Sequence, residues 1–155
     1  MSPRIRRLNA DYNYISTVYR DHPYVKLIET EGVPPEKYTF EFNVKGLVPE
    51  KQGAGYSVSN LHRAEIFLPR EYPRRPPFCR MVTPVFHPNI DPQKICIGDH
   101  WSAGESLAHL IIRICEMICY QSYNIKSPLN GRAAAWAEKE LEQLPLLKND
   151  LRVGL

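Results

Sequence analysis

The stretch HPNIDPQKICIG, residues 87–98, brings a histidine, an asparagine and a cysteine into one short segment. A thiol that solvent can reach can take an acyl group from another thioester and then give it to an amine. A free thiol has a pKa of about 8.5, so a few per cent is thiolate at neutral pH, which is nucleophilic enough without strong activation. Cys96 is therefore a candidate nucleophile.

Asn89 lies seven residues before Cys96 and is the candidate partner in this chemistry. Transfer to an amine passes through a tetrahedral oxyanion, and losing one amide donor to such an oxyanion costs about 2.7–4 kcal/mol in other enzymes. The alternative for Cys96 is a buried apolar role between two isoleucines, because free cysteine is among the most buried residue types. Gly98 and Asp99 follow directly and favour a strand end that opens to solvent.

The remaining cysteines are predicted to pack rather than react, namely Cys79, Cys115 and Cys119. A zinc site that combined Cys96 and Cys79 with His87 and His100 would have spacings that match no ordinary tetrahedral pattern. The chain has neither a CxxC pair nor the cysteine spacing of a disulfide-stapled secreted domain. We therefore expect reduced thiols, a cytoplasmic location, no metal and no cofactor.

Length and composition indicate one globular domain. The chain has 155 residues, 43% of them hydrophobic, and we expect a single domain over residues 1–155 with its core at 4–144. A net charge of +3 is too small to demand nucleic acid or an anionic membrane as a partner. The longest apolar stretch is broken by His109, Arg113 and Glu116, and the first residues lack the apolar region of a signal peptide. We expect a soluble protein.

The elements that would position Cys96 follow from hydrophobic periodicity. A basic amphipathic helix is predicted over residues 4–19, followed by four strands at 24–32, 37–46, 56–69 and 78–84. Residues 90–104 show little regular structure, and a central helix is predicted to follow them, with Ser102 and Glu105 as a capping box. A last helix is predicted over 132–144, with Asn130 as its cap and Pro145 as its stop. This order predicts an α+β fold with helices packed on one antiparallel sheet.

Five motifs occur in a fixed order: YPRRPP, HPN, ICIG, a tryptophan shortly after the cysteine, and SPLN before an alanine-rich helix. This ordered set resembles the ubiquitin-conjugating enzymes over about residues 4 to 140. The resemblance implies a UBC-like fold, with an N-terminal helix, a four-stranded antiparallel meander, an active-site loop, and central and C-terminal helices. It also implies that Cys96 accepts a ubiquitin-like protein as a thioester from an activating enzyme and transfers it to an amine of an acceptor protein.

The resemblance assigns roles to further residues. Asn89 stabilises the oxyanion or braces the loop, and His87 is a structural histidine of the turn rather than a general base. The acceptor path or loop support is assigned to Asp99, Trp101, Tyr123 and Asn124. The basic helix face of Arg4, Arg6 and Arg7 docks the activating enzyme, or is simply a solvated helix side.

Two departures concern the rim of the predicted site. Only four residues separate Cys96 from Trp101, where many family members have a longer loop. Lys126 and Ser127 stand where family members often carry acidic residues that orient the incoming lysine. That task would then be unfilled or fall to Asp99, Tyr123 or Asn124.

A third departure concerns partners. Arg74 replaces the apolar residue of the proline-rich turn to which ligases bind, and Ser102, Ala103 and Gly104 replace the family's Ser-Pro-Ala. These changes argue against a familiar RING-type ligase. They make the chain more similar to bacterial relatives encoded with a ubiquitin-like protein, an activating enzyme and a JAB-type peptidase, some of which serve in antiphage defence.

Two other functions compete with the transferase. One is a catalytically inactive conjugating-enzyme-like module that only recruits a protein partner, although such variants typically lack the cysteine. The other is a structural interaction protein built on the basic helix, whose binding would survive the loss of Cys96.

Overall fold

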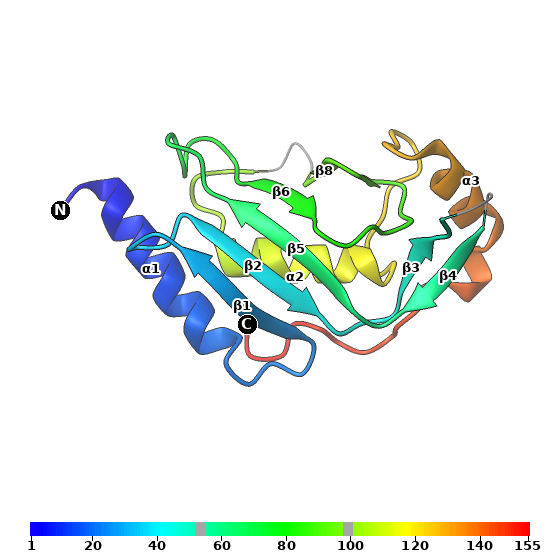
Figure 1. The fold of residues 1–155 in the computed structure, drawn as a ribbon, viewed down its shortest axis with the longest axis horizontal. Coiled ribbons are helices and arrows are strands. Elements are labelled where there is room, and N and C mark those ends of the chain that lie inside the picture. Colours follow the sequence, from blue (N-terminus) through cyan, green and yellow to red (C-terminus); the bar gives the residue numbers. More distant parts are fainter. Residues whose placement is uncertain (52–54, 98–100) are drawn as a thin grey trace.

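The computed structural model describes residues 1–51, 55–97 and 101–155. Its centre is a four-stranded antiparallel sheet in the order β1-β2-β5-β6, formed by β1 (Val25–Glu31), β2 (Lys37–Phe42), β5 (His62–Phe67) and β6 (Phe78–Met81). Helix α2 (Leu107–Ile118) crosses behind this sheet, and α1 (Pro3–Val18) lies beside β1 (Figure 1). The predicted α+β layout is therefore the one that the chain adopts.

The alternation in β2 explains which face of the sheet is covered. Tyr38, Phe40 and Phe42 are fully buried, while the residues between them are partly exposed. On the open face, Glu65 binds Lys37 at 2.7 Å and Arg80 at 2.6 Å. One face thus packs on helices and the other presents charged pairs, as the period of two requires.

One predicted strand is wrong as a single element. Residues 56–69 divide into β4 (Tyr56–Ser59) and β5, because the Ser59 hydroxyl accepts from the Leu61 N–H and turns the chain. β4 leaves the main sheet and pairs with β3 (Gly46–Pro49) in a separate hairpin. Two further short strands, β7 (Ile90–Asp91) and β8 (Lys94–Ile95), lie in the segment predicted to be irregular.

The N-terminal helix is confirmed, and the predicted capping box is wrong. Helix α2 begins after Ser106, which makes no side-chain cap, and the Glu105 N–H donates instead to the carbonyl of Ser102 in a turn. Helix α3 (Gly131–Lys139) has the predicted cap, since the Asn130 side chain accepts from the Ala133 N–H. It is shorter than predicted, because a 3-10 turn (Leu141–Gln143) covers the rest of the way to Pro145.

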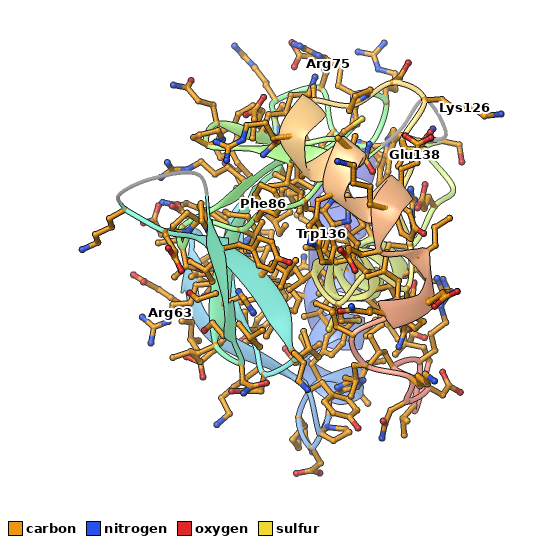
Figure 2. All side chains as sticks on the ribbon, turned by 90° about the vertical axis from the view of Figure 1, so that its right-hand side faces the viewer. Arg63, Arg75, Phe86, Lys126, Trp136 and Glu138 are labelled. Atoms are coloured by element: carbon orange, nitrogen blue, oxygen red, sulfur yellow. The ribbon has the colours of Figure 1, made fainter. Side chains whose placement is uncertain are left out.

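The core lies between the sheet and α2. Cys79, Cys115 and Cys119 are all buried in it, which confirms their predicted packing, and burial raises the pKa of Cys79 to about 12 and of Cys119 to about 11. A second, smaller cluster joins α3 to the β3–β4 hairpin, where the Trp136 ring lies 6.4 Å from that of Phe86 (Figure 2). Within the described residues, no helix combines the length and the apolar character that crossing a membrane requires.

Candidate active site

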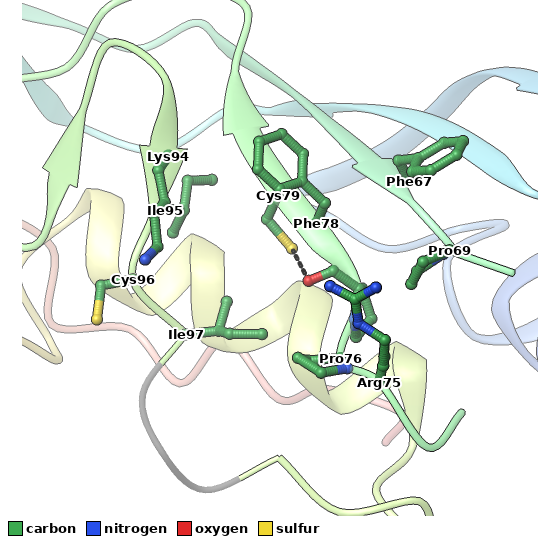
Figure 3. Close-up of a pocket in the computed structure, with 11 residues that line it drawn as sticks. Phe67, Pro69, Arg75, Pro76, Phe78, Cys79, Lys94, Ile95, Cys96 and Ile97 are labelled. Atoms are coloured by element: carbon green, nitrogen blue, oxygen red, sulfur yellow. Dashed lines mark hydrogen bonds between the residues drawn. The ribbon is translucent and has the colours of Figure 1, made fainter. Parts of the chain in front are cut away.

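Cys96 lies directly after β8, where the ladder ends. Its N–H donates to the carbonyl of Asn89 at 2.9 Å, which closes the loop between the two residues. Cys96 is half-buried, whereas the other three cysteines are buried. In Figure 3 its sulfur points away from the side chains of Ile95 and Ile97, as alternation along an extended chain requires. The thiol is the one of the four that solvent can reach.

The Asn89 side chain binds the loop that follows α2. Its Oδ1 accepts from the Asn124 N–H at 2.8 Å, and its Nδ2 donates to the Asn124 carbonyl at 2.9 Å. Asn89 is 7% exposed, so this pair of bonds lies close to the protein interior. The arrangement uses one of the two Nδ2 hydrogens, and it favours the bracing role for this residue in the free protein.

Both ring nitrogens of His87 are occupied. Nδ1 accepts from the Asn89 N–H at 3.0 Å, and Nε2 donates to the Ser122 carbonyl at 3.2 Å. The ring is 1% exposed and lies 4.7 Å from the ring of Tyr120. Burial lowers the pKa of His87 to about 4, so the ring is neutral at physiological pH. This geometry supports a structural histidine and leaves no free nitrogen for a general base.

The carbonyl of Pro88 holds the SPLN segment. It accepts from the N–H of Leu129 at 2.7 Å and from that of Asn130 at 3.0 Å. The residues of HPN therefore bind three successive parts of the segment between α2 and α3, through Ser122, Asn124 and the start of α3. The two motifs that the sequence separates by about forty residues form one rigid frame beside Cys96.

The predicted acceptor-path residues are distributed around this frame. Tyr123 is half-buried, and its ring packs at 5.6 Å on that of Tyr120. Asn124 is exposed, but its side chain accepts from the Lys126 N–H at 2.8 Å and so stabilises its own turn. Asp99 lies outside the described residues.

Trp101 connects the segment after Cys96 to the proline-rich turn. Its Nε1 donates to the carbonyl of Pro73 at 2.8 Å, and its ring lies 5.8 Å from that of Tyr72. Tyr72 donates in turn to the Asp11 carboxylate at 2.6 Å. Trp101 is therefore anchored to the proline-rich turn and, through Tyr72, to α1.

A pocket of about 480 Å³ extends from Cys96 towards the start of β6. Its walls are mostly apolar, and two basic side chains, Arg75 and Lys94, stand among them (Figure 3). Ile95, Cys96 and Ile97 all line this pocket, and in Figure 3 the Cys96 sulfur points away from the two isoleucine side chains.

The three predicted docking arginines differ in their surroundings. Arg4 binds the carbonyls of Pro69 and Arg70, and Arg7 binds Asp11 and the carbonyls of Ala103 and Glu105. These two anchor α1 to neighbouring loops. Arg6 is exposed and binds only the carbonyl of Met1 among the described residues.

No group of three or more metal-ligating side chains is assembled within residues 1–51, 55–97 and 101–155. Two cysteines of the zinc set considered from the sequence differ in exposure: Cys79 is buried in β6, whereas Cys96 is half-buried. His100 lies outside the described residues.

Arg113 is a residue of this site that sequence reasoning missed. It was recognised only as a charge that interrupts an apolar stretch, yet its guanidinium binds the carbonyl of Ile97 and the carboxylate of Glu105. A charge on an otherwise apolar helix was the available signal, because such a charge needs a partner.

Comparison with known proteins adds the family. Residues 14–145 match the sequence profile of the ubiquitin-conjugating enzymes. The chain belongs to this family. The predicted UBC-like fold is thereby confirmed, with its N-terminal helix, antiparallel four-stranded sheet and further helices.

Curated relatives agree with this family membership. The chain is 33% identical over 94 residues to ubiquitin-conjugating enzyme E2 13 of Schizosaccharomyces pombe, covering 57% of this chain and 62% of the relative. It is 29% identical over 82 residues to ubiquitin-conjugating enzyme E2 21 of Caenorhabditis elegans, covering 50% and 38%. It is 32% identical over 87 residues to ubiquitin-conjugating enzyme E2 N of Drosophila melanogaster, covering 53% and 56%. The matched part thus spans about half the length of these relatives.

Proposed function

We propose that this protein is an active transferase, which accepts a ubiquitin-like protein on Cys96 from an activating enzyme and passes it to an amine of an acceptor protein. The observation that carries the proposal is the half-buried Cys96, fixed to Asn89 in the frame that HPN forms with the segment after α2. Family membership supports it, because a member that only recruited a partner would not need a reachable thiol at this position.

The first step is an exchange of thioesters. The Cys96 thiolate attacks the carbonyl carbon of the activating enzyme's thioester, and a new carbon–sulfur bond forms as the old one breaks. The cysteine of the activating enzyme leaves as the thiolate. The reaction needs neither metal nor cofactor, because one thiol replaces another.

The second step forms an amide. The acceptor amine attacks the same carbonyl carbon, a tetrahedral oxyanion forms, and Cys96 leaves as the amine gives up its proton. One Nδ2 hydrogen of Asn89 keeps its hydrogen bond to the Asn124 carbonyl, and the second donates to the oxyanion and stabilises it. Tyr123, Asn124 and Asp99 line the path of the incoming amine.

We further propose the setting of this activity. Residues 1–155 form a single domain that works in the cytoplasm, where its four thiols stay reduced. The partners are an activating enzyme docked on the basic face of α1, a ubiquitin-like protein and an acceptor protein, without nucleic acid, membrane or a familiar RING-type ligase.

The trimmed loop between Cys96 and Trp101 is the reason to propose a bacterial conjugation system, including one that acts in antiphage defence. The neighbouring genes test this assignment. A neighbourhood without a ubiquitin-like protein, an activating enzyme and a JAB-type peptidase would count against it.

A charging assay tests the transferase itself. Incubation with ubiquitin, a ubiquitin-activating enzyme and ATP should give an adduct that reducing agent cleaves. The adduct should be absent from Cys96→Ala and retained by Cys79→Ala, whose thiol is 2% exposed. An adduct that persists in Cys96→Ala would refute the assignment.

Alkylation distinguishes the inactive module. Iodoacetamide should label Cys96 in the native protein before the three buried cysteines. A Cys96 thiol as unreactive as Cys79 would favour a module that only recruits a partner.

A further inference from the structure

The backbone around Cys96 receives little support from strand pairing. β7 and β8 contribute two residue pairs, Ile90 with Ile95 and Asp91 with Lys94, and Cys96 follows the last of them. The peptide that precedes Cys96 is held by the hydrogen bond to Asn89. The carbonyl of Ile97 lies beyond the last residue pair of this ladder, so any support for it comes from outside β7 and β8.

Arg113 supplies that support from α2. Its Nη2 donates to the carbonyl of Ile97 at 2.8 Å, and its Nη1 donates to Oε1 of Glu105 at 2.6 Å. The side chains of Arg113 and Glu105 are 31% and 17% exposed, so water competes only partly for these bonds. A guanidinium is a planar fork with fixed donor directions, and the two bonds therefore fix each other's geometry.

Glu105 is itself held in place. Its carbonyl accepts from Nη2 of Arg7 at 2.6 Å, and its N–H donates to the carbonyl of Ser102 at 3.0 Å. Arg113 thus joins the residue after Cys96 to a segment that is anchored on α1. Its own Cα belongs to α2, the most buried helix of the core.

We propose that Arg113 is a positioning residue for the reaction at Cys96. By fixing the carbonyl of Ile97, it sets the orientation of the Cys96 backbone and so the direction in which the thioester is presented to the amine. It acts through Ile97 and is not itself a catalytic residue. The inference rests on the proposed transferase function, and its chemical consequence follows from the sensitivity of such reactions to small displacements.

A single-turnover assay tests this role. Ubiquitin that carries a C-terminal 2-mercaptoethanesulfonate thioester is used to charge Cys96 without an activating enzyme, and discharge to free lysine is then followed. Arg113→Ala should slow discharge by about tenfold, because a small misplacement of reacting atoms costs that much or more. Arg113→Lys should be intermediate, since one ammonium cannot reproduce the fork.

Two further variants test whether the discharge rate depends on the hydrogen bonds of Arg113, on the charge of Glu105 or on the loss of any ion pair of α2. Glu105→Gln keeps an oxygen that accepts from Arg113 and should discharge at close to the wild-type rate. Arg152→Ala is the matched control. Arg152 forms an ion pair at 2.9 Å with Glu116, which belongs to α2 like Arg113, but Arg152 does not contact the Cys96 segment. It should leave the discharge rate unchanged.

Amide hydrogen exchange gives a readout that does not depend on transfer. Exchange of the Cys96 N–H should be faster in Arg113→Ala and unchanged in Arg152→Ala. Equal discharge rates in the two variants, or slow discharge with unchanged Cys96 exchange, would overturn the proposal. If Arg113→Ala does not fold, Arg113→Lys provides the same comparison.

Failure of the proposed function would look different. Wild-type protein that takes no acyl group from the ubiquitin thioester, like Cys96→Ala, would refute the transferase. The ordering of Cys96 by Arg113 would then be decided by the exchange rates alone.

Discussion

Replacement of His87 by asparagine should change how the free energy of unfolding depends on pH. Burial lowers the pKa of His87 to about 4 in the folded protein, against an ordinary value of about 6.5 in the unfolded chain. Below pH 6.5 the unfolded chain binds a proton at this position that the folded protein does not. Stability is therefore lost as pH falls from about 6.5 towards 4.

The size of the effect follows from the two pKa values. At pH 5 the unfolded histidine is almost fully protonated and the folded one is neutral, so His87 lowers the free energy of unfolding by about 2 kcal/mol relative to pH 7. His22 and His62 also have pKa values lowered by burial and add slopes of the same sign. His22 and His62 are present in both wild type and His87→Asn, so their contributions cancel when the free energies of unfolding of the two proteins are subtracted.

Urea unfolding followed by the fluorescence of Trp101 and Trp136 measures this difference. His87→Asn should be less stable than wild type at pH 7, because the bond to Ser122 is lost, and the gap should narrow by about 2 kcal/mol at pH 5. Asn130→Ala is the control, since it removes the cap of α3 but no titratable group, and its gap to wild type should stay constant. A constant gap for His87→Asn as well would refute a buried, neutral histidine at the centre of the frame.

Further predictions concern the loop and the basic helix. Asn89→Ala should lower the free energy of unfolding by about 1–2 kcal/mol in urea, because both bonds to Asn124 are lost, and an unchanged value would contradict the bracing role. Arg7→Ala should cost about 2 kcal/mol in the same measurement, since it leaves the buried Asp11 carboxylate without its cation. Arg6→Glu should leave stability unchanged and slow charging by the activating enzyme at low salt, so a charging rate equal to wild type would remove Arg6 from the docking surface.

The order of elements could be read from the sequence, because the patterns that specify them are local. The alternation over residues 37–44 gave the buried face of β2, and Asn130 gave the start of α3. The predictions that were wrong depended on competition between local signals. Ser102 and Glu105 have the spacing of a capping box, but the carboxylate of Glu105 is taken by Arg113 and the helix starts later.

The candidate site was predicted as a set of residues but not as an arrangement. The motif order placed Cys96, Asn89 and His87 in one segment, and it suggested both an oxyanion role and a bracing role for Asn89. Tertiary structure showed which partners are bonded, since Asn124 lies 35 positions away along the chain. No spacing rule predicts such a bond, because it depends on how the loop after α2 folds back.

The sequence by itself therefore determined the fold class, the N-terminal helix, the buried face of β2 and the cap of α3, and it singled out Cys96 as the candidate nucleophile. Only the tertiary structure decided which arginines anchor α1 to distant loops: Arg7 binds the carbonyl of Glu105, whereas Arg6 binds the carbonyl of Met1 in its own segment. It also revealed that Arg113 holds the backbone beyond Cys96. The physical reason is that the hydrophobic period of a helix or strand depends on residues close together in the sequence. The partner of a side chain instead depends on how elements far apart in the sequence pack against each other.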